Sequence, residues 1–237
     1  MKIISWNCQG AFRRKAEFIC AENPDILVIQ ECENPNNLVF DLTTRIPNRF
    51  LWFGDNKNKG VGIFSYCDLK LELYEEYNSE FKIVVPLKVT STETNFILFA
   101  ICANNPKEKN SQYVEQVWKA INYYENILTE ERIILIGDFN SNQIWDKKHR
   151  NGNHTDVVNK LKLNGIESVY HTFFAEEHGK ETQPTFYLYR HKDKPYHIDY
   201  CFTSNKLTKK LKKVQVGTYE KWRNYSDHSP IIVEIGN

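Results

Sequence analysis

The sequence has little of what marks a membrane, secreted or repetitive protein. No apolar run approaches the length of a bilayer span, and the N-terminal stretch before Asn7 is too short for a signal peptide. The six cysteines are scattered without a CxxC pair, so they signal neither a zinc site nor a disulfide framework. Internal repeats and low-complexity tracts are also missing. These absences predict a soluble, cytoplasmic protein with reduced, mostly buried thiols and no membrane partner.

Neither sign of charge predominates. Lysine and arginine total 31 and aspartate and glutamate 30, which leaves a net charge of +1. A polyanionic partner must therefore be attracted by a local basic patch rather than by the whole surface. The 237 residues are 41% hydrophobic and 14% aromatic, enough for a substantial core, and no linker interrupts them. We expect a single domain over residues 1–237, a monomer without an obligate protein partner.

The sequence is organised around residues 133–141, which read IILIGDFNS. Four consecutive branched apolar residues predict a strand buried on both faces, and this strand runs directly into Gly137, Asp138 and Asn140. Ligands of open α/β sheets bind at the carboxyl ends of strands, so these polar residues are candidates for a site. Aspartate and asparagine after glycine are equally ordinary turn formers, and the motif alone leaves both interpretations open.

The same arrangement of a buried strand bordered by polar residues recurs along the chain. Strands are predicted at residues 2–6, 25–31, 197–202 and 231–235, and they are bordered by Asn7, Glu31, Asp199, and Asp227 with His228. Together with Asp138 and Asn140 these side chains supply the oxygens that hold a hard divalent cation and activate water toward a phosphate ester. Each has an ordinary alternative, such as a solvated acid at Glu31.

Other elements follow from apolar periodicity and turn signals. Helices are predicted at residues 14–22, 111–128 and 155–163, the last capped by Asn153 or Thr155. The middle of the chain predicts strands at 60–65, 69–74, 81–90 and 95–102, and a later strand is expected at 214–219. Short turns between the middle strands imply antiparallel neighbours.

The order and wording of five motifs resemble the endonuclease/exonuclease/phosphatase superfamily, which includes exonuclease III, deoxyribonuclease I, inositol polyphosphate 5-phosphatases and neutral sphingomyelinases. The motifs are SWNCQG, IQE, GDFNS, HIDYCF and SDHSP, and they span essentially the whole chain. IQE alone is a weak signal, whereas GDFN and SDHSP together are strong. The resemblance implies an α/β (α+β) fold: a four-layer α/β/β/α sandwich, with two mixed β-sheets packed face to face and helices outside.

The resemblance also implies a role for each motif residue. Glu31 would be the principal ligand of Mg²⁺ or Mn²⁺, with Asn7 and Asp227 close to the ion. Asp138 would orient or deprotonate the attacking water, or protonate the leaving oxygen.

The remaining motif residues would bind the phosphate. Asn140 and His228 would donate hydrogen bonds to it, while Asp199 would fix the tautomer of His228 and favour its cation. Many superfamily members also place a tyrosine or histidine before the long central helix. This chain has Asn104 and Asn105 in that region, either of which is a candidate substitute.

Substrate class depends on what surrounds the motifs. A basic rim suits a polyanionic backbone and interleaved aromatic residues can stack on bases, although most aromatic residues in such loops pack against the protein. We therefore predict a nuclease, acting on DNA rather than RNA, over a phosphatase or phosphodiesterase for a small or lipid-linked phosphate, and over an inactive binding module. The predicted substrate-binding residues are Arg13, Lys147, Lys148, Arg150 and Trp222.

Overall fold

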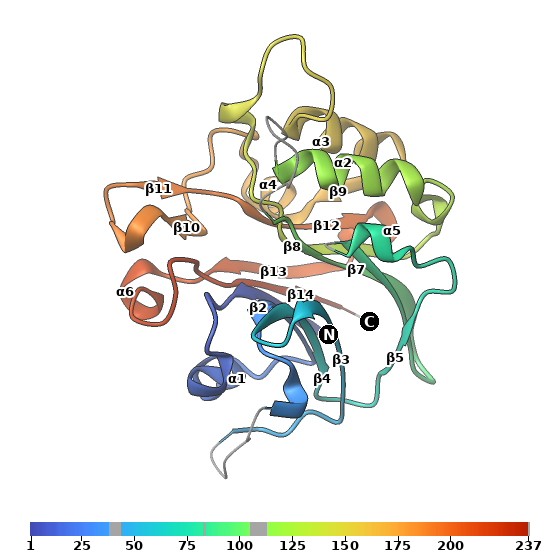
Figure 1. Cartoon of the computed structure of the whole chain (residues 1–237). Helices are drawn as coiled ribbons and strands as arrows, with labels where there is room; N and C mark the ends of the chain where they lie inside the picture. Colours follow the sequence, from blue (N-terminus) through green and yellow to red (C-terminus); the bar gives the residue numbers. More distant parts are fainter. Residues whose placement is uncertain (38–43, 83, 105–112, 237) are drawn as a thin grey trace.

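Two mixed six-stranded sheets form the centre of the computed structural model, which describes residues 1–37, 44–82, 84–104 and 113–236 (Figure 1). The first sheet has the order β13 (Leu211–Val216), β14 (Ile231–Ile235), β1 (Lys2–Asn7), β2 (Ile26–Cys32), β4 (Lys59–Ser65) and β3 (Arg49–Asn56). The second has the order β5 (Lys70–Leu73), β6 (Val84–Thr90), β7 (Asn95–Cys102), β8 (Ile133–Asp138), β12 (Asp199–Ser204) and β9 (Ile166–Ser168).

The continuous apolar run of β8 is explained by burial on both of its faces. Ile134 and Ile136 pack between the two sheets, whereas Ile133 and Leu135 pack beneath helices. The helices on that side are α2 (Tyr113–Tyr123) and α3 (His154–Leu163), and the outer face of the first sheet is covered by α1 (Ala16–Cys20) and α6 (Tyr219–Trp222) (Figure 1). The predicted four-layer sandwich is therefore confirmed.

Strand direction gathers the polar strand ends at one edge. β1 and β2 are parallel, so Asn7 and Gln30 are register partners where both strands end. β8 and β12 are antiparallel, and their register places Asp138 opposite Asp199. The ends of strands from both sheets consequently meet although they are far apart in the sequence.

Several boundaries differ from the sequence-based expectations. The helix expected at 14–22 is a 3-10 turn (Phe12–Arg14) followed by α1, and the strand expected at 214–219 begins earlier, as β13. Of the helix expected at 111–128, residues 111 and 112 lie outside the described part, α2 ends at Tyr123, and a 3-10 turn (Ile127–Thr129) follows. The cap of α3 is Asn153, as predicted, and it forms a capping box with Asp156.

Strands were expected from Phe50 to Cys102, but some elements were not predicted with bounds of their own. They include β3, the helices α4 (Val169–Phe174) and α5 (Asn205–Thr208), and the hairpin of β10 (Phe186–Tyr187) and β11 (Pro195–Tyr196) that projects beside the sheets (Figure 1). β3 is largely exposed and lies at the edge of its sheet, so it has little apolar alternation to reveal it. Among the described residues, no helix is both long and apolar enough to cross a membrane.

Candidate active site

Gly137 allows β8 to carry an acid to the sheet edge. Its φ is 149°, and an added Cβ would lie only 1.9 Å from the carbonyl oxygen of Ile101 in β7. No side chain fits there without moving one strand away from the other. Glycine at this position therefore lets β7 and β8 remain paired up to Asp138, which is buried.

Asp199 and His228 form a buried pair, as the motifs implied. Nδ1 of His228 donates to Oδ2 of Asp199 at 2.8 Å. Burial by itself would lower the pKa of His228, but the charge and hydrogen bond of Asp199 raise this pKa to about 10. The imidazole is therefore a cation at neutral pH, with a proton on Nε2 as well as on Nδ1.

Hydrogen bonds from distant segments fix this pair in place. The indole nitrogen of Trp6 donates to the backbone carbonyl of His228 at 2.9 Å, and the backbone N–H of His228 donates to Ser226 Oγ at 3.0 Å. The backbone N–H of Asp199 donates to the hydroxyl of Thr185 at 3.0 Å. Oδ1 of Asp199 is buried and has no hydrogen-bond partner among the described residues.

Asp138 lies beside this pair and is held from two sides. Nδ2 of Asn7 donates to Oδ2 of Asp138 at 3.0 Å, and the backbone N–H of Asn140 donates to Oδ1 at 2.8 Å. Side-chain atoms of Asp138, Asp199 and His228 lie within 4.8 Å of one another. Burial, followed by the negative charge of Asp199, raises the pKa of Asp138 to about 7. Asp138 can therefore both take up and release a proton near neutral pH.

Glu31 and Asp227 lie at the open side of the site, where both are partly exposed. Glu31 has a φ of 54° at an irregularity in the pairing of β2 with β4, the kind of feature that redirects a side chain. Its Oε2 accepts from Nζ of Lys59 at 2.9 Å. Burial lowers the pKa of Lys15, while the charges of Asp227 and Glu31 act against that shift. Two ammonium groups thus lie near the carboxylates that the motifs assign to a cation.

Gln9 connects the open side to the buried side. Its side chain donates to Oδ2 of Asp227 at 2.9 Å, and its backbone N–H donates to Oδ1 of Asn7 at 3.0 Å. Arg190, from the β10–β11 hairpin, donates through Nε to Oε1 of Gln9 at 3.2 Å. Gln9 belongs to the first motif and could have been noticed there. Lys59 could not, because only the pairing of β2 with β4 brings it to Glu31.

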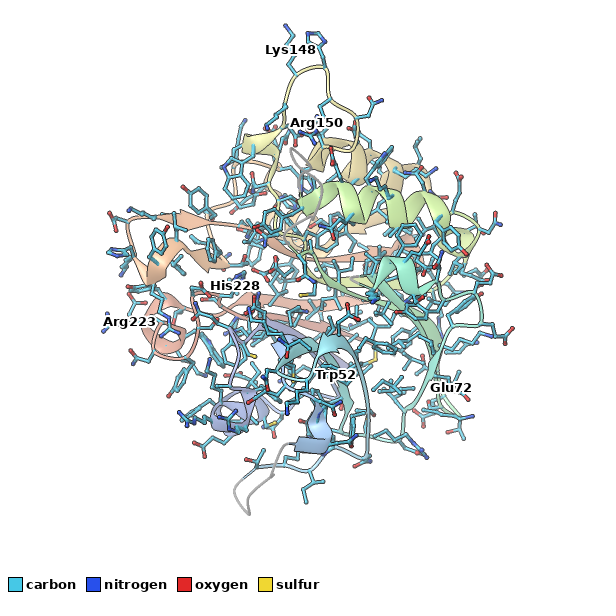
Figure 2. All side chains as sticks on the ribbon, viewed as in Figure 1. Trp52, Glu72, Lys148, Arg150, Arg223 and His228 are labelled. Atoms are coloured by element: carbon cyan, nitrogen blue, oxygen red, sulfur yellow. The ribbon has the colours of Figure 1, made fainter. Side chains whose placement is uncertain are left out.

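The predicted substrate-binding residues are not all free to bind. Lys147 and Lys148 are exposed, and Figure 2 shows Lys148 at the tip of a projecting loop, well away from His228. Arg13 and Arg150 form ion pairs with Glu33 and Glu115.

The burial of Trp222 argues against the prediction that this residue binds substrate. It is 1% exposed, and its ring centroid lies 5.1 Å from that of Trp6. A base could stack on it only if this packing opened. Its role is instead to support β1, whose last residue is Asn7.

Two other aromatic residues are placed better for stacking. The side chain of Trp145 is 41% exposed and that of Tyr189 is 76% exposed. Tyr189 belongs to the segment that joins β10 to β11. Both rings are more exposed than that of Trp222, although the ring centroid of Trp145 lies 5.0 Å from that of Tyr196.

The described residues 95–104, which precede α2, contain no tyrosine or histidine that could contact the phosphate. Asn104 is exposed, and its backbone carbonyl accepts from Gln116 at 2.5 Å. Nδ2 of Asn140 donates to the backbone carbonyl of Ala103 at 3.5 Å. Asn104, the residue after Ala103, therefore lies close to Asn140. Asn105 lies outside the described residues.

Comparison with known proteins agrees with this arrangement. The model of the Endonuclease/Exonuclease/phosphatase family matches residues 4–228. Recombination repair protein 1 of Drosophila melanogaster is 21% identical over 253 residues, which cover 98% of this chain but only 37% of that protein.

Two solved structures show the same fold over their full length. An AP endonuclease from Archaeoglobus fulgidus is 19% identical with a TM-score of 0.73, and 100% of each chain is covered. The 3' phosphatase NExo from Neisseria, bound to a product DNA hairpin, is 21% identical with a TM-score of 0.66, again with 100% of each chain covered. With a family match over nearly all of its length, the chain belongs to the Endonuclease/Exonuclease/phosphatase family.

Proposed function

We propose that this protein is a divalent-metal-dependent phosphodiesterase that hydrolyses the backbone of nucleic acids, DNA in preference to RNA. The observation that carries the proposal is the neighbouring placement of Asp138 and His228. One is an acid with a pKa of about 7, and the other is an imidazole with a pKa of about 10. A proton-transfer group and a fixed cationic donor side by side are what hydrolysis of a phosphate ester requires.

Each buried residue has a separate role in the proposed reaction. Asp138, held by Asn7, takes a proton from the attacking water when ionised and supplies one to the leaving oxygen when protonated. Nε2 of His228 donates to a phosphate oxygen as negative charge builds there, and Asp199 keeps the ring charged and oriented. Asn140, next to the same edge, offers a further side-chain donor.

The oxygens at the open side of the site would suit a hard divalent cation. Glu31 and Asp227 would contribute partly exposed carboxylates, and the buried Asn7 an amide oxygen that already accepts from the backbone N–H of Gln9, with no thiol or imidazole in the set. Lys59 forms an ion pair with Glu31, and the negative charges of Asp227 and Glu31 act on Lys15, which supports a cation as the partner of these acids. Mg²⁺ or Mn²⁺ held there would polarise the phosphate and lower the pKa of bound water.

Nucleic acid as the substrate is supported by exposed groups on loops outside the buried part of the site. Lys147, Lys148, Trp145 and Tyr189 present ammonium groups and aromatic faces to solvent. A solved structure with the same fold holds a DNA hairpin. An alternative is a phosphatase for a terminal or small phosphate, because Arg13 and Arg150 are engaged in ion pairs and the same neighbour is described as a 3' phosphatase.

The decisive experiment compares substrates and metals together. Purified protein is assayed against plasmid, single-stranded DNA, RNA, an abasic duplex, a duplex with a 3' phosphate and a simple phosphodiester, with chelator and then with Mg²⁺ or Mn²⁺ restored. We expect cleavage of DNA that stops in chelator and returns with metal. Full turnover in excess chelator refutes metal dependence, and release of inorganic phosphate alone favours the phosphatase.

A matched pair of variants locates the metal. Glu31→Gln removes the charge at the open side of the site, and should raise the metal concentration needed for half-maximal rate. Glu72→Gln is the control, since Glu72 is an exposed acid far from His228 (Figure 2). Equal metal dependence in both variants would exclude Glu31 as a ligand.

A further inference from the structure

A second cluster of titratable side chains lies outside the candidate active site. His171 of α4, together with His178 and Glu181 of the loop after it, brings two imidazoles and a carboxylate within 4.8 Å of one another. Nε2 of His171 is 3.1 Å from Oε1 of Glu181, and the rings of His171 and His178 stack with centroids 3.5 Å apart. None of these residues belongs to the five motifs.

Two more histidines extend the cluster. Nε2 of His154 lies 3.2 Å from Nδ1 of His178, and the ring centroid of His197 is 6.2 Å from that of His171. Nδ1 of His197 donates to the carbonyl of Gln183 at 2.7 Å, which leaves a lone pair on Nε2. This Nε2 is buried and has no hydrogen-bond partner among the described residues. A buried acceptor without a partner is destabilising, so a bound water molecule next to His197 would be favoured; His197 is not one of the three residues within 4.8 Å of one another.

His178 connects the cluster to solvent, while the side chains of His171 and Glu181 lie behind it. His154 and His178 line an open cavity of about 580 Å³, together with Gln143, Ile144, Glu176 and Gly179. The cavity offers an ion a path to His178 and leaves room for a water molecule as a further ligand.

We propose that His171, His178 and Glu181 bind a transition-metal ion of the Zn²⁺ class at a site separate from the carboxylates of the active site. Two imidazoles and one carboxylate are a donor set typical of Zn²⁺, and a water molecule that enters by way of the cavity at His178 could supply a fourth ligand. Mg²⁺ prefers oxygen ligands alone and is not expected to compete. The site is independent of the proposed function.

Binding requires one side chain to move. A metal lies in the plane of an imidazole that binds it, so two stacked parallel rings cannot bind the same ion. His178 must therefore turn out of its stack with His171. It lies between Ala175, with a φ of 55°, and Gly179, with a φ of 81°, so the loop around it departs from regular helix and strand geometry.

Glu181 is already held in position. Nδ2 of Asn142 donates to its Oε2 at 3.1 Å, and the backbone N–H of Gly179 donates to its Oε1 at 3.0 Å. Such outer contacts orient a metal ligand. Asn142 follows the GDFNS motif directly, so an ion here would attach the loop after α4 to the segment that continues from β8.

Co²⁺ serves as a visible probe for this site. Metal-free protein in excess Mg²⁺ is titrated with Co²⁺, and the absorption of low-coordinate Co²⁺ is followed, with Zn²⁺ displacement measured afterwards. We expect one ion per chain. His178→Gln and Glu181→Gln should each weaken binding by at least about 10-fold, the lower end of the loss seen when even an outer contact of a metal ligand is removed. His191→Gln, an exposed histidine of the β10–β11 hairpin, is the control and should bind normally.

The two metal sites are distinguished by Glu31→Gln, which should leave Co²⁺ binding unchanged. Absence of binding to the wild-type protein, equal affinity in Glu181→Gln, or loss of binding in Glu31→Gln would each overturn the proposal. A further test uses only the wild-type protein, so the misfolding of a variant cannot affect its result. Zn²⁺ should shift the imidazole NMR signals of His171 and His178 and leave that of His228 in place, and a shift centred on His228 would refute the site. Any of these failures leaves nuclease activity to be judged by its own assay.

Discussion

Replacing Asp199 with asparagine should give a catalytic defect that depends on pH. The substitution keeps the size of the side chain and a carbonyl that can accept from His228, but it removes the charge that raises the pKa of that imidazole to about 10. Without this charge the pKa should fall toward its ordinary value near 6.5, since burial lowers it and only the charges of Asp138 and Asp227 remain to raise it. The fall from about 10 to 6.5 corresponds to roughly 5 kcal/mol, close to the loss of roughly 3–5 kcal/mol for breaking a buried ion pair.

The expected rates follow from the fraction of His228 that remains charged. With a pKa of 6.5, about three quarters of the rings are cationic at pH 6, but only about 3% at pH 8. Relative to wild type, Asp199→Asn should therefore lose less than about 2-fold in kcat/KM at pH 6 and about 30-fold at pH 8. Taking the ratio to wild type at each pH removes the contribution of groups that do not interact with Asp199. Asp138 is not one of them, because the charge of Asp199 raises its pKa, so its titration is followed separately by NMR in both proteins.

Two controls identify the pair as the cause. Asp193→Asn, which removes an exposed acid on the β10–β11 hairpin, should show a ratio near one at every pH. His228→Ala should lose about 10² to 10³ in rate, and the double variant with Asp199→Asn should be scarcely slower. A ratio that does not change between pH 6 and pH 8, or an NMR signal of His228 that still titrates above pH 9 in Asp199→Asn, would refute the reasoning.

Three further predictions test the fold and the substrate. Gly137→Ala should lower the free energy of unfolding by roughly 3 kcal/mol or more, measured by urea denaturation, because its Cβ would lie 1.9 Å from a backbone oxygen; a loss below 1 kcal/mol would contradict the close approach. Replacing Lys147 and Lys148 with alanine should reduce the slope of log K against log salt for DNA binding by up to about 2, and an unchanged slope would mean that neither contacts a phosphate. Trp222→Ala should lower the free energy of unfolding by roughly 3–5 kcal/mol, whereas Trp145→Ala should weaken DNA binding with little loss of stability. Weaker DNA binding by Trp222→Ala without a loss of stability would instead identify Trp222 as the stacking residue.

The parts of the site that sequence could predict are those set by local order along the chain. A run such as IILI is buried wherever it occurs, and the polar residue that ends it must lie at a sheet edge. Asp138 and Glu31 were found in this way. The contact between Asp199 and His228, across 29 positions, came from the family resemblance rather than from spacing.

What could not be predicted depends on partners brought together by the fold. Arg13 looks free in the sequence, but Glu33 neutralises it from the far end of β2. Trp222 stands among charged residues and reads as exposed, yet it packs on Trp6. Lys59 begins β4, and the pairing of β2 with β4 alone brings it to Glu31. Exposure and ion pairing are tertiary properties, so a basic or aromatic residue next to a motif is weak evidence of substrate contact.

The burial of two carboxylates at the same edge requires its own explanation. Asp138 and Asp199 are both almost fully buried, and they share one imidazolium. Two negative charges beside one positive charge would be unstable in a low-dielectric interior, and the site meets this cost by letting Asp138 bind a proton near pH 7. Glu31 and Asp227 are partly exposed and do not carry this burial cost. Burial thus separates the two tasks in the proposed function, because the inner acid exchanges protons where solvent cannot stabilise its charge, whereas the outer acids would bind the metal at the open side of the site.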